Sequence, residues 1–597
     1  MRCRDRAASL IVASGDVACQ RVLGVRQAGA AQLIRPSRAL SALLGLVVLA
    51  VAPAGSPARA ASAVPTPTVT AMPGERPGTP GRNYPFFSTD IVLANYGYVE
   101  EEFFFEGTAN TYSTPASGTA AEVVTSGTPY RSRLFVRRPT DPRRFNGVVI
   151  VEWFNVTNGY DVDVLWLYQK EFFLREGYAW VGVSAQNVGV SRPPNGLKVW
   201  SPKRYGSLDV DGAGKVPGDA LSYDIYSQAA AAIRQVKAVL GGLTPTHVMA
   251  AGQSQSSGRL ATYFNGIHGR DPIYDSAFLT VNTSPMRSDL EIPVIKVLSE
   301  NEAATSRNQK DSAKMRTWTV AGATHSEQYS LLSRAAFLKR DLALEAVDNC
   351  ETPARSRVEI RYVYNAAVDA LVKWKRTGAA PPHGPELTFE GTTLQRDRFG
   401  NALGGIRLAE IEAAVANESA ERCGLGGTHV PFAPEVLNAL YRTHGDYVAK
   451  VTAAADAAVK AGFLLPADRA QTVDTARRSI YGRQLICGPL CADVRQFPRN
   501  PSSMLLGKQT AYLLIQDPDR TLVTTMDRVT ALIAEGYTLA TDPRARKKFG
   551  DAARALQSYL DAVRRLQTKG RMAPETASLL IDQATTLRRL VEAQGGL

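Results

Sequence analysis

A serine, a histidine and two glutamates occupy positions in this chain from which they could together perform acyl transfer. Ser254 lies in the run GQSQS at residues 252–256, between an apolar run and a segment compatible with a helix. A serine hydroxyl is a weak nucleophile near neutral pH, so it needs an adjacent base and nearby amide donors. A sharp turn between a strand and a helix supplies that setting. We therefore predict that Ser254 is a catalytic nucleophile.

The run differs from the usual Gly-x-Ser-x-Gly pattern at its last position, where Ser256 replaces the second glycine. Glycine at these positions lets backbone and side chains pass closely, and serine is a small polar replacement. In a chain with 48 glycines the match alone is weak, because an ordinary strand-to-helix loop would fit it as well. The prediction for Ser254 therefore depends on candidate partners later in the chain.

A candidate acid and a candidate base come after the serine, each at the end of a strand-like run. Glu300 and Glu302 come directly after residues 292–298, and His325 ends residues 316–325. Single histidines and carboxylates in loops are usually exposed or structural. Three candidates in the order serine, acid, histidine, each at the end of a strand signal, favour a catalytic triad.

The elements that must position these residues alternate between strands and helices. Strand signals are residues 98–106, 131–138, 147–153, 178–183, 247–251, 277–281 and 292–298, and helix signals are residues 163–175, 219–240 and 259–264. This alternation predicts an α/β fold with a mostly parallel sheet and helices on both faces. Residues 191–211 and 331–464 exceed what connections need, and we predict that parts of them form a cap over the site.

Five motifs in register resemble a secreted bacterial α/β-hydrolase-domain family. They are VEWFNVTN at 151–158, SYDIY at 222–226, SENE at 299–302, VAGATH at 320–325 and GNALGGIR at 400–407, and the resemblance spans about residues 85–481. It implies an α/β-hydrolase fold with cap insertions and serine esterase chemistry. The family's Thr-Glu-Thr-Asp run places its acid on Glu302, where this chain has the longer carboxylate. Glu300 remains an alternative acid.

The implied chemistry proceeds through an acyl-enzyme. His325 takes the Ser254 proton and returns it to the leaving alcohol, while Glu302 fixes the imidazole tautomer. The backbone N–H of Gln255 is the first predicted oxyanion donor, and Asn155 is the second by its motif position. Loss of one such donor commonly costs ~3 kcal/mol. The mechanism needs no metal and no organic cofactor.

Aromatic residues near these motifs are candidates for the walls of a substrate pocket. We predict that Trp153 and Phe154 bind substrate; most aromatic residues, however, pack in cores. The wider set of candidates comprises Trp153, Phe154, Trp166, Trp200 and Tyr205. Nothing in the sequence identifies the ester.

The first 60 residues have the pattern of an export signal. Residues 35–38 carry two arginines, residues 39–52 are apolar, and residues 58–60 read Ala-Arg-Ala, an Ala-x-Ala cleavage site. An ordinary signal peptide would begin near residue 30, so the start of the chain is open. We expect a secreted or cell-envelope protein cleaved near Ala60, followed by an exposed linker at 61–84.

Charge and cysteine usage fit that compartment. The leader holds eight arginines and two aspartates, so it carries +6 of the net charge of +13 and leaves about +7. That excess excludes a nucleic-acid binder and is compatible with anionic envelope polymers. Export leaves four cysteines, Cys350, Cys423, Cys487 and Cys491. Two disulfides with three alternative pairings are expected, free buried thiols are an alternative, and a zinc site at residues 487–491 is weakly supported.

The last part of the chain predicts a separate helical module. Apolar residues recur at helical spacing three times between residues 522 and 591. We divide the chain into the hydrolase domain at 85–490 and an all-α bundle at 510–597, which either stabilises the protein or contacts the envelope. Two functions remain: an exported serine esterase acting on a small or polymer-attached ester, and an inactive hydrolase fold that binds the cell surface. The oligomeric state is open.

Overall fold

The computed structural model describes residues 63–113, 120–307, 309–346, 355–479, 481–482, 520–539 and 543–595. The predicted leader lies outside these residues, as do Cys350, Cys487 and Cys491, so the leader and the cysteine pairing stay predictions. No helix in the described part is long and apolar enough to cross a membrane.

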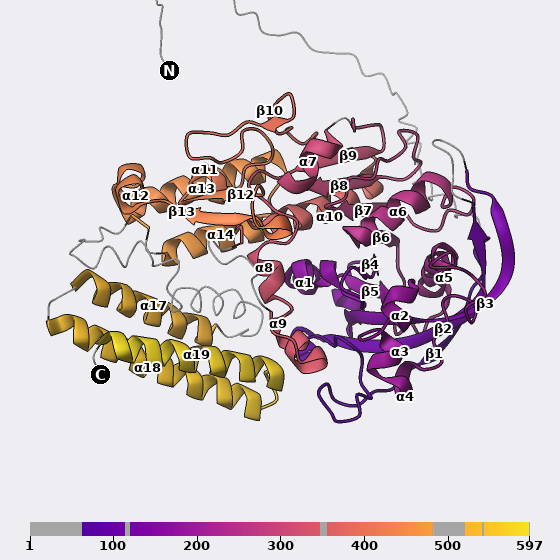
Figure 1. Ribbon diagram of the computed structural model, residues 1–597, viewed down its shortest axis with the longest axis horizontal. Coiled ribbons are helices and arrows are strands. Elements are labelled where there is room, and N and C mark those ends of the chain that lie inside the picture. The colour runs from indigo at the N-terminus through magenta and orange to yellow at the C-terminus, as the bar shows by residue number, and fades with distance from the viewer. Residues whose placement is uncertain are drawn as a thin grey trace, which may run out of the picture. The chain divides into compact units, whose positions relative to one another are not determined.

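A nine-stranded sheet organises the described chain, with the strand order β1-β2-β3-β5-β4-β6-β7-β8-β9 (Figure 1). The six strands β5, β4, β6, β7, β8 and β9 run parallel to one another, and β1, β2 and β3 form an antiparallel edge. The strand bounds are β1 Thr68–Ala71, β2 Tyr98–Tyr112, β3 Val123–Pro139, β4 Val148–Trp153, β5 Ala179–Val183, β6 His247–Gln253, β7 Ser276–Thr280, β8 Val294–Leu298 and β9 Met315–Thr319.

Helices cover both faces of this sheet. Their bounds are α1 Val164–Glu176, α2 Asn187–Ser191, α3 Leu197–Trp200, α4 Pro202–Tyr205, α5 Ser222–Gln235, α6 Gln255–Gly266, α7 Glu300–Ser306, α8 Gln328–Leu332, α9 Ala335–Phe337, α10 Ile360–Thr377, α11 Ala409–Glu412, α12 Pro434–Leu440, α13 His444–Ala461, α14 Pro466–Arg478, α17 Thr521–Leu539, α18 Pro543–Thr568 and α19 Pro574–Gly595. Two small hairpins lie beyond the main sheet. They are β10 Phe389–Glu390 with β11 Thr393–Leu394, and β12 Ala416–Ser419 with β13 Thr428–Pro431.

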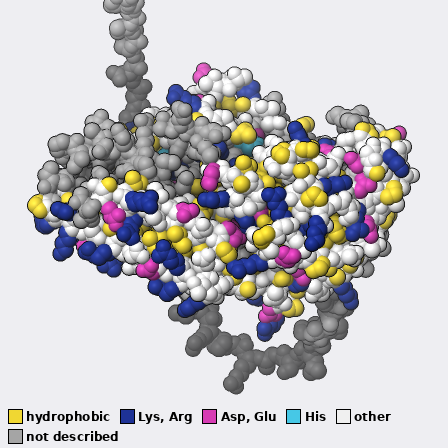
Figure 2. Space-filling model, turned by 60° about the horizontal axis from the view of Figure 1, so that its bottom comes forward, with side chains coloured by type: hydrophobic (Ala, Val, Ile, Leu, Met, Phe, Trp, Pro, Cys, Tyr) yellow, Lys and Arg dark blue, Asp and Glu magenta, His cyan; other side chains and the backbone are white. Residues whose placement is uncertain are grey.

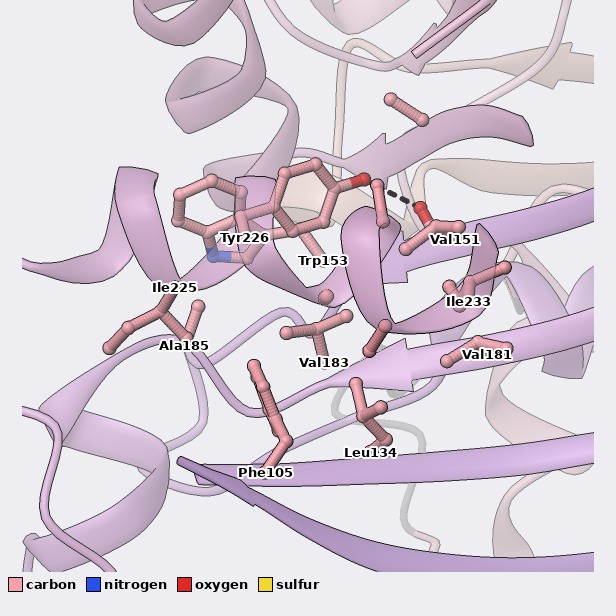
Figure 3. Packing of buried hydrophobic residues seen from close by; sticks show 14 of the residues in the cluster. Phe105, Leu134, Val151, Trp153, Val181, Val183, Ala185, Ile225, Tyr226 and Ile233 are labelled. Atoms are coloured by element: carbon pink, nitrogen blue, oxygen red, sulfur yellow. Dashed lines mark hydrogen bonds between the residues drawn. The ribbon is translucent and has the colours of Figure 1, made fainter. Parts of the chain in front are cut away.

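Strand β4 contributes side chains to two hydrophobic cores, one on each face of the sheet. Successive side chains of a strand point to opposite faces. Val149 and Val151 join the core with α5 and α6, whereas Val148 and Ile150 join the core with α1 and α10. The first core also holds Tyr226, whose hydroxyl donates to the Val151 carbonyl at 2.6 Å (Figure 3). A strand buried on both faces reads as a continuous apolar run, as the sequence predicted.

The structure corrects three expectations about the elements. Residues 68–71, placed in a linker, form β1 and pair with β2. The helix expected over 219–240 is shorter, because the backbone is extended at Val236 with φ −98° and ψ 97°. Helix α10, within the expected cap, instead packs on β7 and β8 as a layer of the core.

The other expected cap segment, residues 191–211, contacts the antiparallel edge of the sheet. Arg204 pairs with Glu102 of β2 at 2.5 Å between Nη2 and Oε2, and both side chains are buried. The Tyr205 hydroxyl donates to the same carboxylate at 2.8 Å. A cap role for this segment stays a prediction.

The helices α17, α18 and α19 pack on one another around a hydrophobic cluster of their own. That cluster also includes Leu332 and Ala336 from the α8–α9 segment. An ion pair of 2.6 Å joins Arg340 to Glu575, and the Thr576 hydroxyl donates to the Asp90 carbonyl at 3.0 Å. These helices are the predicted all-α bundle. On the face that Figure 2 shows, basic side chains are interleaved with acidic ones.

Candidate active site

The turn at Ser254 has the backbone strain expected of a nucleophile held at a sharp bend. Ser254 joins β6 to α6 with φ 57° and ψ −115°, a conformation that L-residues rarely adopt. Its N–H donates to the Thr280 carbonyl at 2.9 Å, which ties the turn to the end of β7. A Cβ at Gly252 would lie 2.9 Å from Leu260 Cδ1 and 3.1 Å from backbone atoms of Ser256 and Ser257, so the motif's first glycine lets β6 and α6 approach closely at the turn.

Ser256 uses its hydroxyl to brace this turn. Its Oγ donates to the Gln253 carbonyl at 3.0 Å and accepts from the Gln253 N–H at 3.1 Å. The side chain is fully buried. The departure from glycine is therefore built into the turn and adds two hydrogen bonds.

His325 and Glu302 form a hydrogen-bonded pair at the ends of β9 and β8. The distance from His325 Nδ1 to Glu302 Oε1 is 2.7 Å. Glu302 is fixed through Oε2, which accepts from the Ser299 N–H at 3.1 Å and from the Ser299 hydroxyl at 2.6 Å. With the proton on Nδ1 shared with the carboxylate, Nε2 is left as the acceptor that a general base needs.

Glu300 is engaged elsewhere. Its Oε1 accepts from the Gly322 N–H at 2.7 Å, while Oε2 lies 3.1 Å from the Arg396 guanidinium and accepts from the Ala420 N–H at 3.2 Å. Burial raises the pKa of Glu300, and Arg396 opposes that effect. Glu300 thus links α7 to the 396–420 region, whereas Glu302 alone of the two contacts His325.

The strand ends place the serine and the histidine at the same edge of the sheet. Ser254 follows β6 and His325 follows β9, and the intervening strands are parallel. The part of the chain that is described shows no hydrogen bond between the Ser254 hydroxyl and the His325 ring. Such bonds often form fully only when substrate is bound. Both side chains are partly exposed.

The predicted oxyanion donors surround the turn. Gln255 is the first residue of α6, and the first N–H groups of a helix have no partner within the helix. The Asn155 N–H donates to the Val162 carbonyl at 3.2 Å, and its side-chain amide donates to the Gln253 carbonyl at 2.8 Å. The next N–H, of Val156, faces the Gln255 side chain at 3.3 Å. The sequence analysis did not single out Val156, although it lies in the same motif as Asn155.

Trp153 and Phe154 are buried core residues in this structure. The Trp153 ring centroid lies 4.7 Å from that of Tyr226, and the Phe154 ring centroid lies 5.9 Å from that of Trp180. Trp166, Trp200 and Tyr205 are buried as well. Their surroundings account for these residues by packing, and their substrate role stays a prediction.

A polar network that the sequence did not reveal holds the first helical residue after the turn. Gln255 Nε2 donates to Gln186 Oε1 at 2.9 Å, and Gln186 Nε2 donates to Asp219 Oδ2 at 2.8 Å. Arg259 of α6 pairs with Asp219 at 2.8 Å. Glutamines at this spacing carry no sequence signal for such a network. No cluster of three or more His, Cys, Asp or Glu side chains suited to a metal occurs among the residues described.

At Ser254 a strand passes through a strained turn into a helix, and most of the sheet is parallel. A comparison of the sequence with models of protein families agrees with this architecture. The model of a family described as "Alpha/beta hydrolase domain" matches residues 64–474. The chain belongs to this family. Membership confirms the α/β-hydrolase fold expected from the sequence motifs. No curated protein sequence matches the chain.

Esterases and a related hydrolase are among the solved structures similar to this α/β-hydrolase-domain chain. Esterase 2 of Thermogutta terrifontis is 13% identical, with 32% of this chain and 78% of that chain covered and a TM-score of 0.19. An esterase of Rhizomucor miehei is 12% identical, with 47% of this chain and 85% of that chain covered and a TM-score of 0.26. A putative dienelactone hydrolase of Klebsiella pneumoniae is 14% identical, with 36% of this chain and 85% of that chain covered and a TM-score of 0.20. Similarity at this level is too low to transfer a function.

Proposed function

We propose that the protein is an exported serine hydrolase that cleaves carboxylic esters through Ser254, His325 and Glu302. The observation that carries this proposal is the Glu302–His325 pair of 2.7 Å, which stands at the sheet edge that also presents the strained Ser254. Membership of the α/β-hydrolase-domain family supports the reaction class.

The reaction proceeds through these groups in two stages. The Ser254 oxygen attacks the ester carbonyl while His325 Nε2 takes the hydroxyl proton, and the protonated ring returns that proton to the leaving alkoxide. The acyl group is then bonded to Ser254. Water attacks this acyl-enzyme with His325 again as the base, and the acid product leaves as the serine oxygen regains its proton. Glu302 holds the ring's orientation and stabilises its charged form.

The negative oxygen formed in each stage needs donors. The backbone N–H of Gln255 supplies the first. Asn155 is the second by motif, and the neighbouring Val156 N–H has the Gln255 side-chain oxygen as its partner in the absence of substrate. Donors fixed by a fold stabilise the transition state with little reorganisation, and the Val156 N–H would reach the substrate oxygen only after the Gln255 side chain has moved aside.

A fluorophosphonate probe tests this proposal directly. The native protein should be labelled at Ser254, and Ser254→Ala should abolish labelling, whereas the matched change Ser284→Ala should not. Mass spectrometry of the digested protein locates the adduct. Absence of labelling in folded protein would favour the alternative, an inactive hydrolase fold that binds the cell surface through α17, α18 and α19.

Export and disulfide bonding belong to the same proposal. The Ala-Arg-Ala run at 58–60 and the even number of cysteines after it support them. Amino-terminal sequencing of protein recovered outside the cytoplasm should read from residue 61. A protein that retains its first 60 residues there would contradict processing near Ala60.

A further inference from the structure

The loop after β4 meets the serine turn through the side chain of Gln255. The Val156 N–H donates to Gln255 Oε1 at 3.3 Å. The Asn155 N–H donates to the Val162 carbonyl at 3.2 Å, and the Thr157 N–H donates to Asn155 Oδ1 at 2.9 Å. Of these three N–H groups, that of Val156 is the one bound by the residue that directly follows the nucleophile.

The Gln255 carboxamide is held firmly at its nitrogen and loosely at its oxygen. Nε2 donates to Oε1 of the buried Gln186 at 2.9 Å. Gln186 in turn donates to Asp219 Oδ2 at 2.8 Å and accepts from Trp153 Nε1 at 3.0 Å. Most N–H···O bonds in proteins are about 2.7–3.2 Å long, so the 3.3 Å bond from Val156 is the weaker end.

An ion pair fixes the far end of this network. Asp219 Oδ2 lies 2.8 Å from Arg259 Nη2 on α6, and Asp219 Oδ1 accepts from the Asn187 N–H at 2.8 Å. The network thus returns to the helix that begins beside the nucleophile. Gln186 and Asp219 are fixed by these bonds, whereas Gln255 is partly exposed. Gln255 is therefore the side chain of the network that can withdraw.

We propose that the Gln255 side chain closes the oxyanion site before substrate binds, and that the substrate oxygen displaces it from the Val156 N–H. The inference rests on the function proposed above and assigns the second oxyanion donor to Val156. Asn155 then holds the loop against the turn through the Gln253 carbonyl.

The exchange of acceptors at the Val156 N–H has a physical reason. Val156 is buried, and a buried N–H without an acceptor is unfavourable. The Gln255 oxygen therefore stabilises the site before substrate binds and opposes the binding of an ester. The negative oxygen of the tetrahedral intermediate forms a stronger, charge-assisted bond and so displaces the neutral carboxamide.

Gln255→Met tests the inference in the full-length protein, because methionine keeps the length of the side chain and removes its amide. With 4-nitrophenyl acetate, KM should fall by about 2- to 10-fold and kcat should stay the same, since the bound ester oxygen already needs the N–H. The Ki of phenylboronic acid, whose adduct with Ser254 places an oxygen at the same site, should fall equally. Gln471→Met on α14 is the matched control and should change none of these constants.

Replacing the residue that anchors Gln255 gives a second test. Gln186→Met should lower KM by a smaller factor, and it should add nothing to Gln255→Met in the double variant, because Gln186 acts on the site through Gln255. An unchanged or raised KM in Gln255→Met, or a loss of kcat, would overturn the inference, since the carboxamide would then not oppose binding. If Gln186→Met does not fold, the Gln255 variant decides.

Amide hydrogen exchange separates this inference from the esterase proposal. In Ser254→Ala protein with isotope-labelled valine, the Val156 N–H should exchange about 2- to 10-fold faster when Gln255→Met is added. Gln471→Met should leave this rate unchanged. Faster exchange, in a protein that hydrolyses no ester before Ser254 is replaced, would keep the Gln255 contact and reject the esterase function. Ester hydrolysis together with an unchanged exchange rate would overturn the inference and leave the esterase function intact.

Discussion

The described part of the chain contains two histidine–glutamate pairs with the same atomic contact and different surroundings. In both pairs the histidine Nδ1 is bonded to a glutamate Oε1: His325 with Glu302 at the sheet edge, and His429 with Glu418 across the small hairpin of β12 and β13. The His325 side chain is 13% exposed and the His429 side chain 4%. Only the first pair lies at the strand ends that also present a strained serine.

Burial assigns the second pair a structural role. It lowers the pKa of His429, and the Arg357 guanidinium lowers it further against the pull of Glu418. A histidine held neutral in a closed hairpin links two strands and has no reacting group to serve. The comparison teaches that a histidine–carboxylate contact alone does not identify a catalytic base; solvent access and a nucleophile must accompany it.

The largest difference in kcat is expected when each of the two histidines is replaced in turn. His325→Ala should lower kcat for an activated ester by about 10⁴- to 10⁶-fold, because the serine loses its base. His429→Ala should leave kcat unchanged and lower the free energy of unfolding by about 2 kcal/mol, since Glu418 remains buried without its partner. Ester hydrolysis and urea unfolding measure the two effects. Equal losses of kcat would remove the distinction.

Substitutions at the two glutamates of α7 test which of them serves as the triad acid. Glu302→Gln should lower kcat by about 10²- to 10⁴-fold, because an amide favours the wrong imidazole tautomer. Glu300→Gln should mainly reduce stability, by about 1–3 kcal/mol, through its weakened bonds to Gly322 and Arg396. Steady-state kinetics and urea titrations are the measurements. Full activity in both variants would mean that neither residue is the triad acid.

The pH dependence of stability should come from the buried histidines. Burial lowers the pKa of His247 to about 4 from its ordinary 6.5, and that of His429 also falls. The unfolded chain binds more protons in this window, so stability is lost as the pH falls from about 6.5 through 4, on the order of 3 kcal/mol for His247. In His247→Gln this part of the loss should be absent. Urea titrations between pH 7 and 4 measure it, and equal slopes for both proteins would contradict the assignment.

The smallest effect is expected at the brace of the serine turn. Ser256→Ala removes two hydrogen bonds to Gln253 and should lower the free energy of unfolding by about 1–2 kcal/mol. The loss of kcat should stay well below that of Glu302→Gln, because Ser254 keeps its ties to Thr280 and to α6. Unfolding and kinetic data on the same sample test this order. A larger kcat loss than in Glu302→Gln would place the brace in the reaction itself.

The sequence predicted the parallel part of the sheet well because those strands are buried on both faces. Residues 147–153, 247–251 and 292–298 are mostly apolar runs, interrupted inside only by Glu152 and Lys296, and each contributes a strand. The antiparallel edge was harder to predict. Strand β2 continues through Gly107 to Tyr112, and the short β1 lies in a Pro- and Thr-rich stretch, so neither has a clear apolar signal.

The contact between His325 and Glu302 was predictable from strand ends and motif, because both residues follow parallel strands at one edge. The roles of Glu300, Ser256 and Gln186 were not predictable in the same way. Each depends on a partner distant in the sequence or on turn geometry, such as Arg396 for Glu300. Local spacing carries no information about such partners.

The ion pair between Arg340 and Glu575 has a practical consequence for deletion mapping. A protein truncated after residue 519 would expose Leu332 and Ala336 to solvent, and Arg340 would lose its ion pair with Glu575. These three residues lie on the segment that follows His325. Any drop in turnover after such trimming would report a damaged surface as readily as a lost module. Point substitutions on the outward faces of α18 and α19 are the cleaner way to ask what these helices touch.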